Sequence, residues 1–394
     1  MTSPTTTGAS NGSHEPYQPP PYPYDRLNQF KVAGEAFEGG LVDLSIGTPR
    51  DPAPAAAVAA LASSGAERGY PPSIGLPAAR EAASAWLQRC FNATVPADQV
   101  AATIGTKEFV VTTTRYLHLR RPDRDTVLYP AVSYPSYAMG AELAGLRAVA
   151  VPVDEQWRID LSAIDEADAD RALCLWVNSP GNPAGGIDDL EQVGEWGRAR
   201  SVPVLSDECY IEFTWGDVPA GRRRGGRTIL EHGTEGVLAL HSLSKRSNLA
   251  GARFGFYAGD PELIWFLSEV RKHSGNMVPG PVQHAAIAAL SDDAHVDVQR
   301  DRYAERLAYM AEVLGGCGID ADLPQGGFYL WVPAPGGDAW EVARWLATEG
   351  GVLVSPGEFY GAAGEHYFRV AVVEDLDRLR LVGDRLADKQ FATT

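Results

Sequence analysis

Six short and nearly all-apolar runs between residues 126 and 258 constrain the fold of this chain more than any other feature. They contain four to six residues each and lie at 126–129, 148–153, 172–177, 202–206, 237–241 and 254–258. Such runs are typical of strands that helices bury on both faces. The segments between them, such as 188–200, have helical length and period. The pattern therefore predicts a mainly parallel sheet with helices on both faces.

The pattern changes after Pro261. Long amphipathic helices are expected around 262–273 and 282–314, followed by two hairpin-like runs at 327–332 and 367–372. With 394 residues the chain is long enough for two to three domains of about 150 residues, or for one large α/β enzyme with an appendage. We therefore expect a second, α+β domain in this part of the chain.

Composition excludes several classes of protein. The chain carries 34 Lys and Arg against 51 Asp and Glu, and its net charge of -17 repels the phosphate backbone of nucleic acids. The sequence shows neither a long apolar span nor a signal peptide, so membrane insertion and export are not expected. The four cysteines lack C-x-x-C spacing. This fits a reducing cytoplasm and gives no support for a metal site, a redox dithiol or a disulfide framework.

Two segments lie outside this scheme. Residues 1–24 are rich in Thr, Ser, Gly, Pro and Tyr, a composition that cannot build a core, and we expect them to form a flexible arm. The basic run at 222–224 is flanked by glycines and is expected to be a solvated loop.

Polar side chains gather directly after three of the predicted strands, where open α/β sheets bind their ligands. Asn178-Ser-Pro-Gly-Asn-Pro183 follows one strand, Ser206-Asp-Glu-Cys-Tyr210 the next and His241-Ser-Leu-Ser-Lys245 the third. They place an amide, a carboxylate, a phenol and an amine at one edge of the sheet. An enzyme that uses pyridoxal phosphate needs this set: an amine for the Schiff base, a carboxylate for the pyridine nitrogen, and donors for the ring oxygen.

On these motifs the chain resembles a fold-type I, class I/II aminotransferase from about residue 24 to residue 386. The resemblance implies pyridoxal 5′-phosphate, a mainly parallel seven-stranded sheet with helices on both faces, and a smaller α+β domain. It also implies a homodimer that acts on an L-amino acid and a 2-oxo acid. The expected division is an arm at 1–24, a segment at 25–46 that joins the small domain, a large cofactor-binding domain at 47–270 and a small domain at 271–394.

The resemblance assigns catalytic roles to three residues and phosphate binding to two more. Lys245 stands at the position of the Schiff-base lysine, with Ser242 three residues before it and Arg253 eight residues after it as phosphate ligands. Asp207 matches the carboxylate that keeps the pyridine nitrogen protonated. Tyr210 matches a donor to the ring oxygen.

Further cofactor contacts follow from the same resemblance. Thr106 and Lys107 belong to the turn, opening a helix, whose backbone N–H groups cradle the phosphate. Asn182 matches a second group on the ring oxygen, and Tyr134 matches the aromatic residue that stacks on the ring. Tyr70 matches a tyrosine that reaches the phosphate of the neighbouring subunit.

The substrate contacts are expected at three positions. Arg369 matches the arginine that binds the substrate α-carboxylate through two parallel bonds, a task that lysine cannot perform. Asn182 can also touch this carboxylate, and Gly47 matches a glycine that lets the substrate pass close to the backbone. As a strand residue, Arg369 could instead face water.

Several alternatives remain at this level. The Ser242-x-x-Lys245 spacing also occurs in penicillin-binding proteins and β-lactamases, but their Lys-Thr-Gly and Ser-Asp-Asn motifs do not occur in this sequence. A transcription regulator with an aminotransferase-like domain would need a longer segment ahead of the fold than residues 1–24 provide. Lyases and decarboxylases of the same fold keep the same ring contacts and are not excluded.

Within the family, the chain resembles the succinyldiaminopimelate aminotransferase group of actinobacteria. This resemblance rests on residues 104–108, 207–210, 241–251 and 271–283. It implies N-succinyl-L,L-diaminopimelate and glutamate as the substrate pair, in lysine biosynthesis, with an aspartate, alanine or other diaminopimelate substrate as the alternative. A distal acidic group on the substrate would require a cation, and the candidates are Lys272, Arg246 and Arg50.

Overall fold

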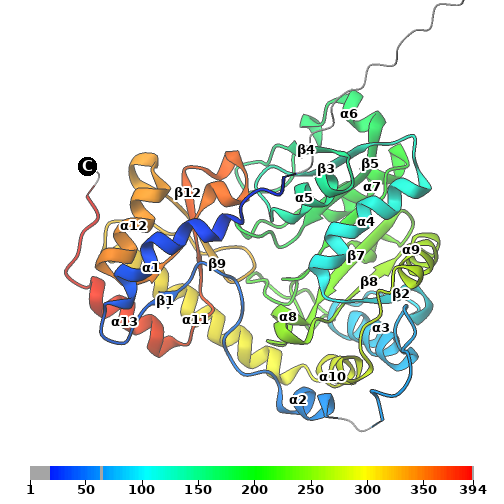
Figure 1. Cartoon of the computed structure of the whole chain (residues 1–394), viewed down its shortest axis with the longest axis horizontal. Coiled ribbons are helices and arrows are strands. Elements are labelled where there is room, and N and C mark those ends of the chain that lie inside the picture. The colour runs from blue at the N-terminus through cyan, green and yellow to red at the C-terminus, as the bar shows by residue number, and fades with distance from the viewer. Residues whose placement is uncertain (1–17, 63–64, 393–394) are drawn as a thin grey trace, which may run out of the picture.

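The computed structural model describes residues 18–62 and 65–392, which form two lobes with a large sheet in one of them (Figure 1). This sheet contains, in spatial order, β2 (Val100–Thr103), β8 (Gly255–Gly259), β7 (Val237–Ser242), β6 (Val204–Asp207), β5 (Ala172–Asn178), β3 (Thr126–Pro130) and β4 (Arg147–Val151). β8 runs in the opposite direction to the other six strands. The predicted mainly parallel, seven-stranded sheet is confirmed. Strand β2 was not predicted, because its Val-Ala-Ala-Thr sequence is short and poor in bulky side chains.

Both faces of the sheet are buried, because alternate strand residues join different apolar clusters. In β5, Leu175 and Val177 lie in one cluster, whereas Cys174 and Trp176 lie in the other. The first face is covered by α2 (Ala55–Leu61), α3 (Pro77–Phe91), α7 (Leu190–Arg200) and α10 (Gly280–Leu290). The second is covered by α4 (Thr106–Arg120), α5 (Ser136–Leu143) and α9 (Pro261–His273). A short helix, α6 (Glu166–Arg171), leads directly into β5.

The smaller lobe has its own core around a three-stranded antiparallel sheet. Its strands are β11 (Ser355–Pro356), β12 (Tyr367–Ala371) and β9 (Tyr329–Pro333), in that order. The two runs predicted as hairpin-like therefore pair, but α12 (Ala339–Glu349) lies between them in the chain. A strand from the N-terminal segment, β1 (Val42–Asp43), pairs with β10 (Val352–Leu353). The helices of this lobe are α1 (Asn28–Glu35), α11 (Ala294–Gly316), α12 and α13 (Leu376–Leu386).

The single amphipathic stretch expected at 282–314 is divided into α10 and α11. The break falls at Ser291-Asp292-Asp293, where the Asp292 side chain accepts a hydrogen bond from the N–H of Ala294 instead of continuing the helix. Helix α10 packs on α2 and α3, whereas α11 packs on α13 and β9. The chain thus passes from the large lobe to the small one at this break, further along than the division at 271 that the sequence suggested.

The end of the N-terminal arm is folded onto the small lobe. Residues 1–17, which make up most of the predicted flexible arm, lie outside the described residues. Tyr24 packs edge-on against Phe359, and its hydroxyl is 3.0 Å from that of Tyr360. Tyr24 therefore differs from the expected flexible arm, because its ring packs against this lobe, whereas Tyr22 is 52% exposed.

The basic run at 222–224 also differs from its expectation. Arg224 is buried and forms an ion pair with buried Glu212, and Arg222 pairs with Glu231. The prediction of a solvated loop is wrong for these two residues, because their carboxylate partners come from other segments of the chain. Within residues 18–62 and 65–392, no helix combines the length and apolar character that a membrane crossing requires.

Candidate active site

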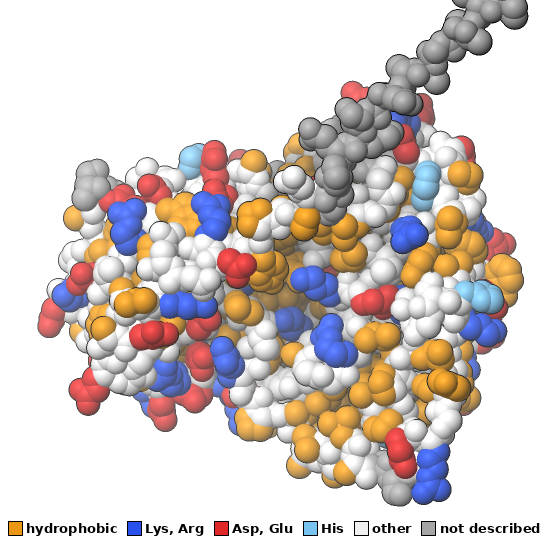
Figure 2. All heavy atoms as spheres, viewed as in Figure 1, with side chains coloured by type: hydrophobic (Ala, Val, Ile, Leu, Met, Phe, Trp, Pro, Cys, Tyr) orange, Lys and Arg blue, Asp and Glu red, His pale blue; other side chains and the backbone are white. Residues whose placement is uncertain are grey.

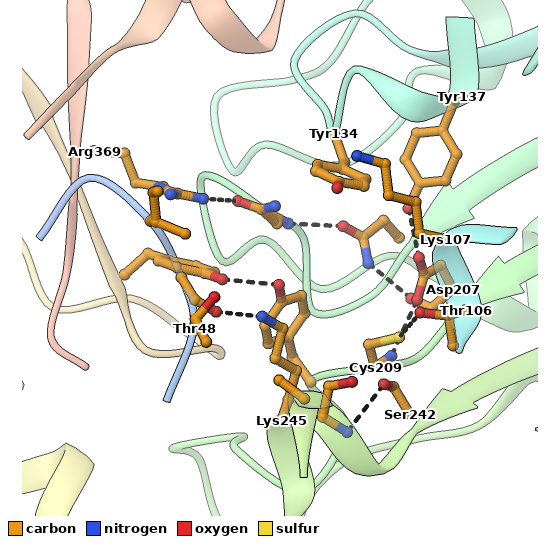
Figure 3. A pocket seen from close by; sticks show the side chains of 18 of the residues that line it. Thr48, Thr106, Lys107, Tyr134, Tyr137, Asp207, Cys209, Ser242, Lys245 and Arg369 are labelled. Atoms are coloured by element: carbon orange, nitrogen blue, oxygen red, sulfur yellow. Dashed lines mark hydrogen bonds between the residues drawn. The ribbon is translucent and has the colours of Figure 1, made fainter. Parts of the chain in front are cut away.

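A cavity of about 250 Å³ lies between the lobes, at the carboxyl ends of β5, β6 and β7. Figure 2 shows a hollow in this region with Lys and Arg side chains around it, and Figure 3 shows the lining side chains. All but one of the residues that the family resemblance assigned to the cofactor or the substrate line this cavity: Gly47, Thr106, Lys107, Tyr134, Asn182, Asp207, Tyr210, Ser242, Lys245, Arg253 and Arg369. The exception is Tyr70, whose side chain is 94% exposed.

Lys245 lies in α8 (Leu243–Arg246), a single turn that follows β7 directly. Ser242 begins this turn, and its hydroxyl accepts a hydrogen bond from the N–H of Ser244. The Lys245 amine donates to the backbone oxygen of Gly47, which belongs to the opposite wall. Burial lowers the pKa of Lys245 to about 8, and the nearby charges of Arg369 and Arg253 contribute to this shift. The amine is therefore poised to lose its proton near neutral pH.

Asp207 ends β6 and is held by two donors. Its Oδ2 accepts a hydrogen bond of 2.9 Å from the Tyr137 hydroxyl, and its Oδ1 accepts one of 3.2 Å from the Cys209 N–H. Burial raises the pKa of Asp207. A buried carboxylate of this kind is stabilised by a cationic ligand group. Tyr137 was not identified from the sequence, although it lies one helical turn after Tyr134.

An anion-binding cradle forms at the start of α4. Gly105 precedes this helix with a φ of 71°, and a Cβ atom there would lie 2.2 Å from Nη2 of Arg253. The Arg253 guanidinium therefore lies against the helix N-terminus, where free N–H groups favour negative charge. Thr106 is the first residue of the helix, and its hydroxyl lies 3.6 Å from the Cys209 sulfur.

Arg369 forms the opposite side of the cavity. Its Nη1 donates to Oδ1 of Asn182 at 2.7 Å, and its Nη2 donates to the Ser45 carbonyl at 2.5 Å. The guanidinium carbon lies 4.3 Å from the ring centre of Tyr329 and 4.8 Å from that of Tyr360. Contacts of this type hold a guanidinium in a fixed plane. The side chain is buried, so the alternative that it faces water does not apply.

Tyr329 is a second residue that the sequence did not single out. Its hydroxyl is 2.8 Å from that of Tyr210, although the two residues come from different lobes. A Cβ atom at Gly47 would lie 2.1 Å from the Tyr329 hydroxyl. This close approach explains why glycine is required at position 47. Because Tyr329 lies in an apolar strand, its sequence context gave no sign of this contact.

The mouth of the cavity is lined by Tyr22, Tyr24, Tyr134 and Lys107. The Lys107 amine is 5.6 Å from the ring centre of Tyr22 and 5.7 Å from that of Tyr134. Figure 3 shows Lys107 beside Tyr134. Among the residues that the structure describes, no carboxylate forms an ion pair with Lys107. Its positive charge is thus available to a ligand.

The three cations proposed from the sequence to bind a distal acidic group do not line the cavity. Arg246 is buried behind it, in ion pairs with Glu212 and Asp293, so its assignment as a substrate contact is wrong. Lys272 and Arg50 pair with Glu269 and Glu374, respectively. Sequence position alone could not reveal these partners, because most of them lie far away in the chain.

The residues in the cavity fit pyridoxal phosphate. The cradle at Gly105 and Arg253 suits its phosphate, and the buried Asp207 carboxylate suits its pyridine nitrogen. The phenol of Tyr210 and the amine of Lys245 match its ring oxygen and its aldehyde. In contrast, the part of the chain that the structure describes contains no cluster of three or more His, Cys, Asp or Glu side chains that could hold a metal ion.

Comparison with known proteins identifies one family. The chain matches the family described as aminotransferase class I and II over residues 40–382. It is 40% identical to 4-dedimethylamino-4-oxo-anhydrotetracycline transaminase of Streptomyces rimosus, over 93% of this chain and 99% of that protein. It is 41% identical to a probable aminotransferase of Mycobacterium tuberculosis, over 93% of this chain and 85% of that protein. A solved structure of a probable N-succinyldiaminopimelate aminotransferase from Thermus thermophilus superposes with a TM-score of 0.81 and 29% identity. The superposition covers 93% of this chain and 99% of that one.

Proposed function

The chain belongs to the class I and II aminotransferases, and from this premise we propose that it exchanges amino groups between N-succinyl-L,L-diaminopimelate and glutamate or their 2-oxo acids. Members of the family use pyridoxal 5′-phosphate, so the aminotransferase class and the cofactor are established. The substrate pair is the proposal. It is supported by the similarity to the Thermus thermophilus protein and by the position of Lys107.

Besides Lys245, which would attach the cofactor, seven residues of the cavity would hold it by non-covalent contacts. When bound, pyridoxal phosphate supplies the aldehyde that carries the amino group and the ring that accepts electrons from the substrate. Thr106, Ser242 and Arg253 would bind its phosphate. Tyr134 would stack on the ring, and Asp207 would pair with its pyridine nitrogen. The ring oxygen would be bound by Tyr210 and Asn182.

Two residues would act on the substrate. Arg369 is fixed between two tyrosine rings, so its guanidinium can bind the α-carboxylate in one orientation. Lys245 would take the proton from the α-carbon on Nζ and return it later in the reaction. Because burial lowers the pKa of Lys245 to about 8, a useful fraction of the amine is unprotonated near neutral pH. A base held next to its target also gains effective concentration.

The observation that carries the substrate proposal is the charge of Lys107 at the cavity mouth. Lys107 is exposed, and its amine lies between two tyrosine rings and faces the same space as Lys245 and Arg369. An acidic group at the far end of a substrate would pair with it. The flexible lysine stem would allow both the long succinylated chain and the short glutamate chain to reach the same charge.

A screen of the two half-reactions tests this proposal. The loss of the cofactor absorbance is followed with N-succinyl-L,L-diaminopimelate, L,L-diaminopimelate, glutamate, aspartate and alanine in turn. We expect the first compound and glutamate to have the highest kcat/KM. A value for aspartate or alanine about tenfold above the succinylated compound would exclude the substrate but not the class. Release of ammonia or carbon dioxide would indicate a lyase or a decarboxylase. Binding of the cofactor without turnover of any amino acid would indicate a regulator.

A second candidate substrate is a large aromatic ketone. The name of the Streptomyces rimosus relative gives an oxo-anhydrotetracycline as its substrate. The tyrosine rings at positions 22 and 24 favour this possibility, because flat ligands stack on such rings. The same screen therefore includes a polycyclic amine as amino donor. A faster half-reaction with this compound than with any acidic amino acid would favour the second candidate.

We further propose that the enzyme is a homodimer in the cytoplasm. Tyr70 is almost fully exposed and lies outside the cavity of its own chain, as expected for a residue that completes the site of a partner. All four cysteines, Cys90, Cys174, Cys209 and Cys317, are free thiols, which supports a reducing compartment.

A further inference from the structure

A second, much smaller cavity lies behind the floor of the active site. Its volume is about 10 Å³, roughly the space that one water molecule needs. Cys209 and Ser242 line both cavities, so only one layer of residues separates them. The small cavity is also lined by Glu208, Glu212, His241 and Trp86. The mechanism above uses none of these four side chains.

Glu208 and His241 face each other across this space. Glu208 Oε2 is 3.5 Å from His241 Nε2, which is the outer limit for a direct hydrogen bond. Both side chains are buried, with 0% and 3% exposure. Neither Oε2 of Glu208 nor either ring nitrogen of His241 has another hydrogen-bond partner. Buried polar atoms without a partner are rare and require an explanation.

The neighbouring Glu212 provides a direct contrast. It lines the same cavity, but it accepts hydrogen bonds from Trp86 and Arg246 at 2.8 Å and forms an ion pair with Arg224. The donors to Glu208 are all neutral: Ser206 Oγ at 2.9 Å and the Ile229 N–H at 2.8 Å bond its other oxygen, and the Thr228 hydroxyl also lowers its pKa as a hydrogen-bond donor. The two arginines are thus committed to Glu212. An ionised Glu208 would be a buried charge without a cation, which is costly.

The surroundings of His241 likewise disfavour the protonated, positively charged form of its ring. Its ring centre lies 5.0 Å from that of Trp86 and 4.9 Å from that of Phe256. A ring that is wedged between aromatic side chains and lacks a carboxylate bond is expected to be neutral. A neutral imidazole has one nitrogen that accepts a hydrogen bond. Glu208 in its acid form carries the matching O–H donor.

The backbone places this pair at the ends of the two strands that carry the chemistry. The Glu208 N–H donates to the Leu240 carbonyl at 2.9 Å, and Leu240 is the register partner of Asp207. Glu208 follows Asp207 directly and lies on the other face of the sheet. His241 immediately precedes Ser242 and the turn that contains Lys245. A link between Glu208 and His241 therefore holds the end of β6 against the end of β7.

We propose that Glu208 is a neutral carboxylic acid that donates its proton toward neutral His241, and that this pair positions Asp207 and Lys245 relative to each other. The single water that the cavity admits completes the hydrogen bonds of the pair. Glu208 and His241 are then positioning residues, and Asp207 is the only anion that the end of β6 presents to the cofactor. This inference does not depend on the identity of the amino acid substrate.

The pKa shifts agree with the geometry. Burial raises the pKa of Glu208 to about 8 and lowers the pKa of His241 to about 3. The charged and titratable groups around the pair are Glu212, Arg246, Cys209 and Glu231. The pKa of Glu208 is higher in the folded protein than in the unfolded protein. The contribution of Glu208 to stability is therefore complete at pH values below the pKa that it has in the unfolded protein. That contribution is lost as the pH rises from about 4.5 through about 8.

The test compares Glu208→Gln and Glu208→Ala in the full-length holoenzyme, with Glu212→Gln as the matched control. Glutamine imitates the neutral acid and keeps an N–H donor for His241. Urea unfolding is measured at about pH 6 and about pH 9, on either side of the raised pKa of Glu208. The dissociation constant of pyridoxal phosphate is measured with the same preparations.

We expect the unfolding midpoint of Glu208→Gln to exceed that of the wild type by more at the higher pH than at the lower pH, because the wild type loses the contribution of Glu208 progressively over this interval. Glu208→Ala should raise the dissociation constant of pyridoxal phosphate about tenfold, and glutamine should restore it to within about twofold. Glu212→Gln should be destabilised at both pH values, because it leaves two buried arginines without their carboxylate.

Three outcomes would overturn the proposal. Glu208→Gln could fail to fold or lose as much stability at the lower pH as Glu212→Gln, which would show that Glu208 is ionised. The difference in unfolding midpoint between Glu208→Gln and the wild type could be the same at both pH values, which would show that Glu208 holds no proton in the folded protein. Unchanged cofactor affinity in Glu208→Ala would show that the pair does not position Asp207 and Lys245.

Discussion

Nη1 of Arg369 lies 2.7 Å from Oδ1 of Asn182, although the arginine belongs to the small lobe and the asparagine follows β5 of the large lobe. Two further hydrogen bonds extend this contact into the large sheet. The backbone N–H of Asn182 donates to Oδ1 of Asn178, and the side-chain amide of Asn178 donates to the backbone carbonyl of Asp207. The expected carboxylate-binding residue and the expected partner of the pyridine nitrogen are therefore connected through two asparagine side chains.

Lys245 is expected to carry the cofactor. Reduction of the holoenzyme with borohydride, followed by peptide mapping, should place one pyridoxyl group per chain on this residue. Lys245→Ala should lose activity by about 10³-fold or more, because it removes both the attachment point and the base. The exposed Lys272→Ala is the control and should behave as wild type. A reduced adduct on any other lysine would contradict the assignment.

Asp207 and Tyr210 should differ in their importance. Asp207→Ala should abolish nearly all transamination, because without the carboxylate the pyridine ring loses its proton and accepts electrons poorly. Tyr210→Phe removes one neutral hydrogen bond and should lower kcat by roughly tenfold at most. The two variants are compared by kcat at saturating cofactor. Equal and mild losses in both would refute the roles given to these residues.

Lys107 should determine the preference for acidic substrates. Lys107→Met keeps most of the stem but removes the charge, and it should lower kcat/KM for glutamate and N-succinyl-L,L-diaminopimelate by about tenfold or more. Alanine has no distal carboxylate, so its kcat/KM serves as the internal control and should change little. A parallel loss for all three compounds would instead assign Lys107 to the cofactor alone.

Tyr70 should act across a subunit interface. Light scattering is expected to give the mass of a dimer, and Tyr70→Phe should weaken pyridoxal phosphate binding by roughly tenfold, the effect of one hydrogen bond to a charged group. Phe keeps the ring, so the mass of the dimer should not change. A fully active monomer would exclude this role.

The sequence predicted those features that depend on local pattern. The apolar runs located six of the seven strands of the large sheet, and the polar residues after three of them line the cavity. Contacts between distant segments were not predictable. Tyr329 lies 119 residues from Tyr210, and its strand resembles any other buried strand. Arg246 follows Lys245 directly, yet its partners Glu212 and Asp293 direct it away from the substrate.

The ion pair between Arg246 and Asp293 connects the turn that contains Lys245 to the small lobe. Nη2 of Arg246 is 3.0 Å from Oδ1 of Asp293, the residue that begins α11, so the turn that carries Lys245 is tied to one end of this helix. The helix has 23 residues and is about 34 Å long. Its N-terminal end lies beside the turn that carries the reacting amine. One ion pair thus joins the start of a long small-lobe helix to the turn that holds Lys245, so the two lobes are anchored to each other beside the reacting amine.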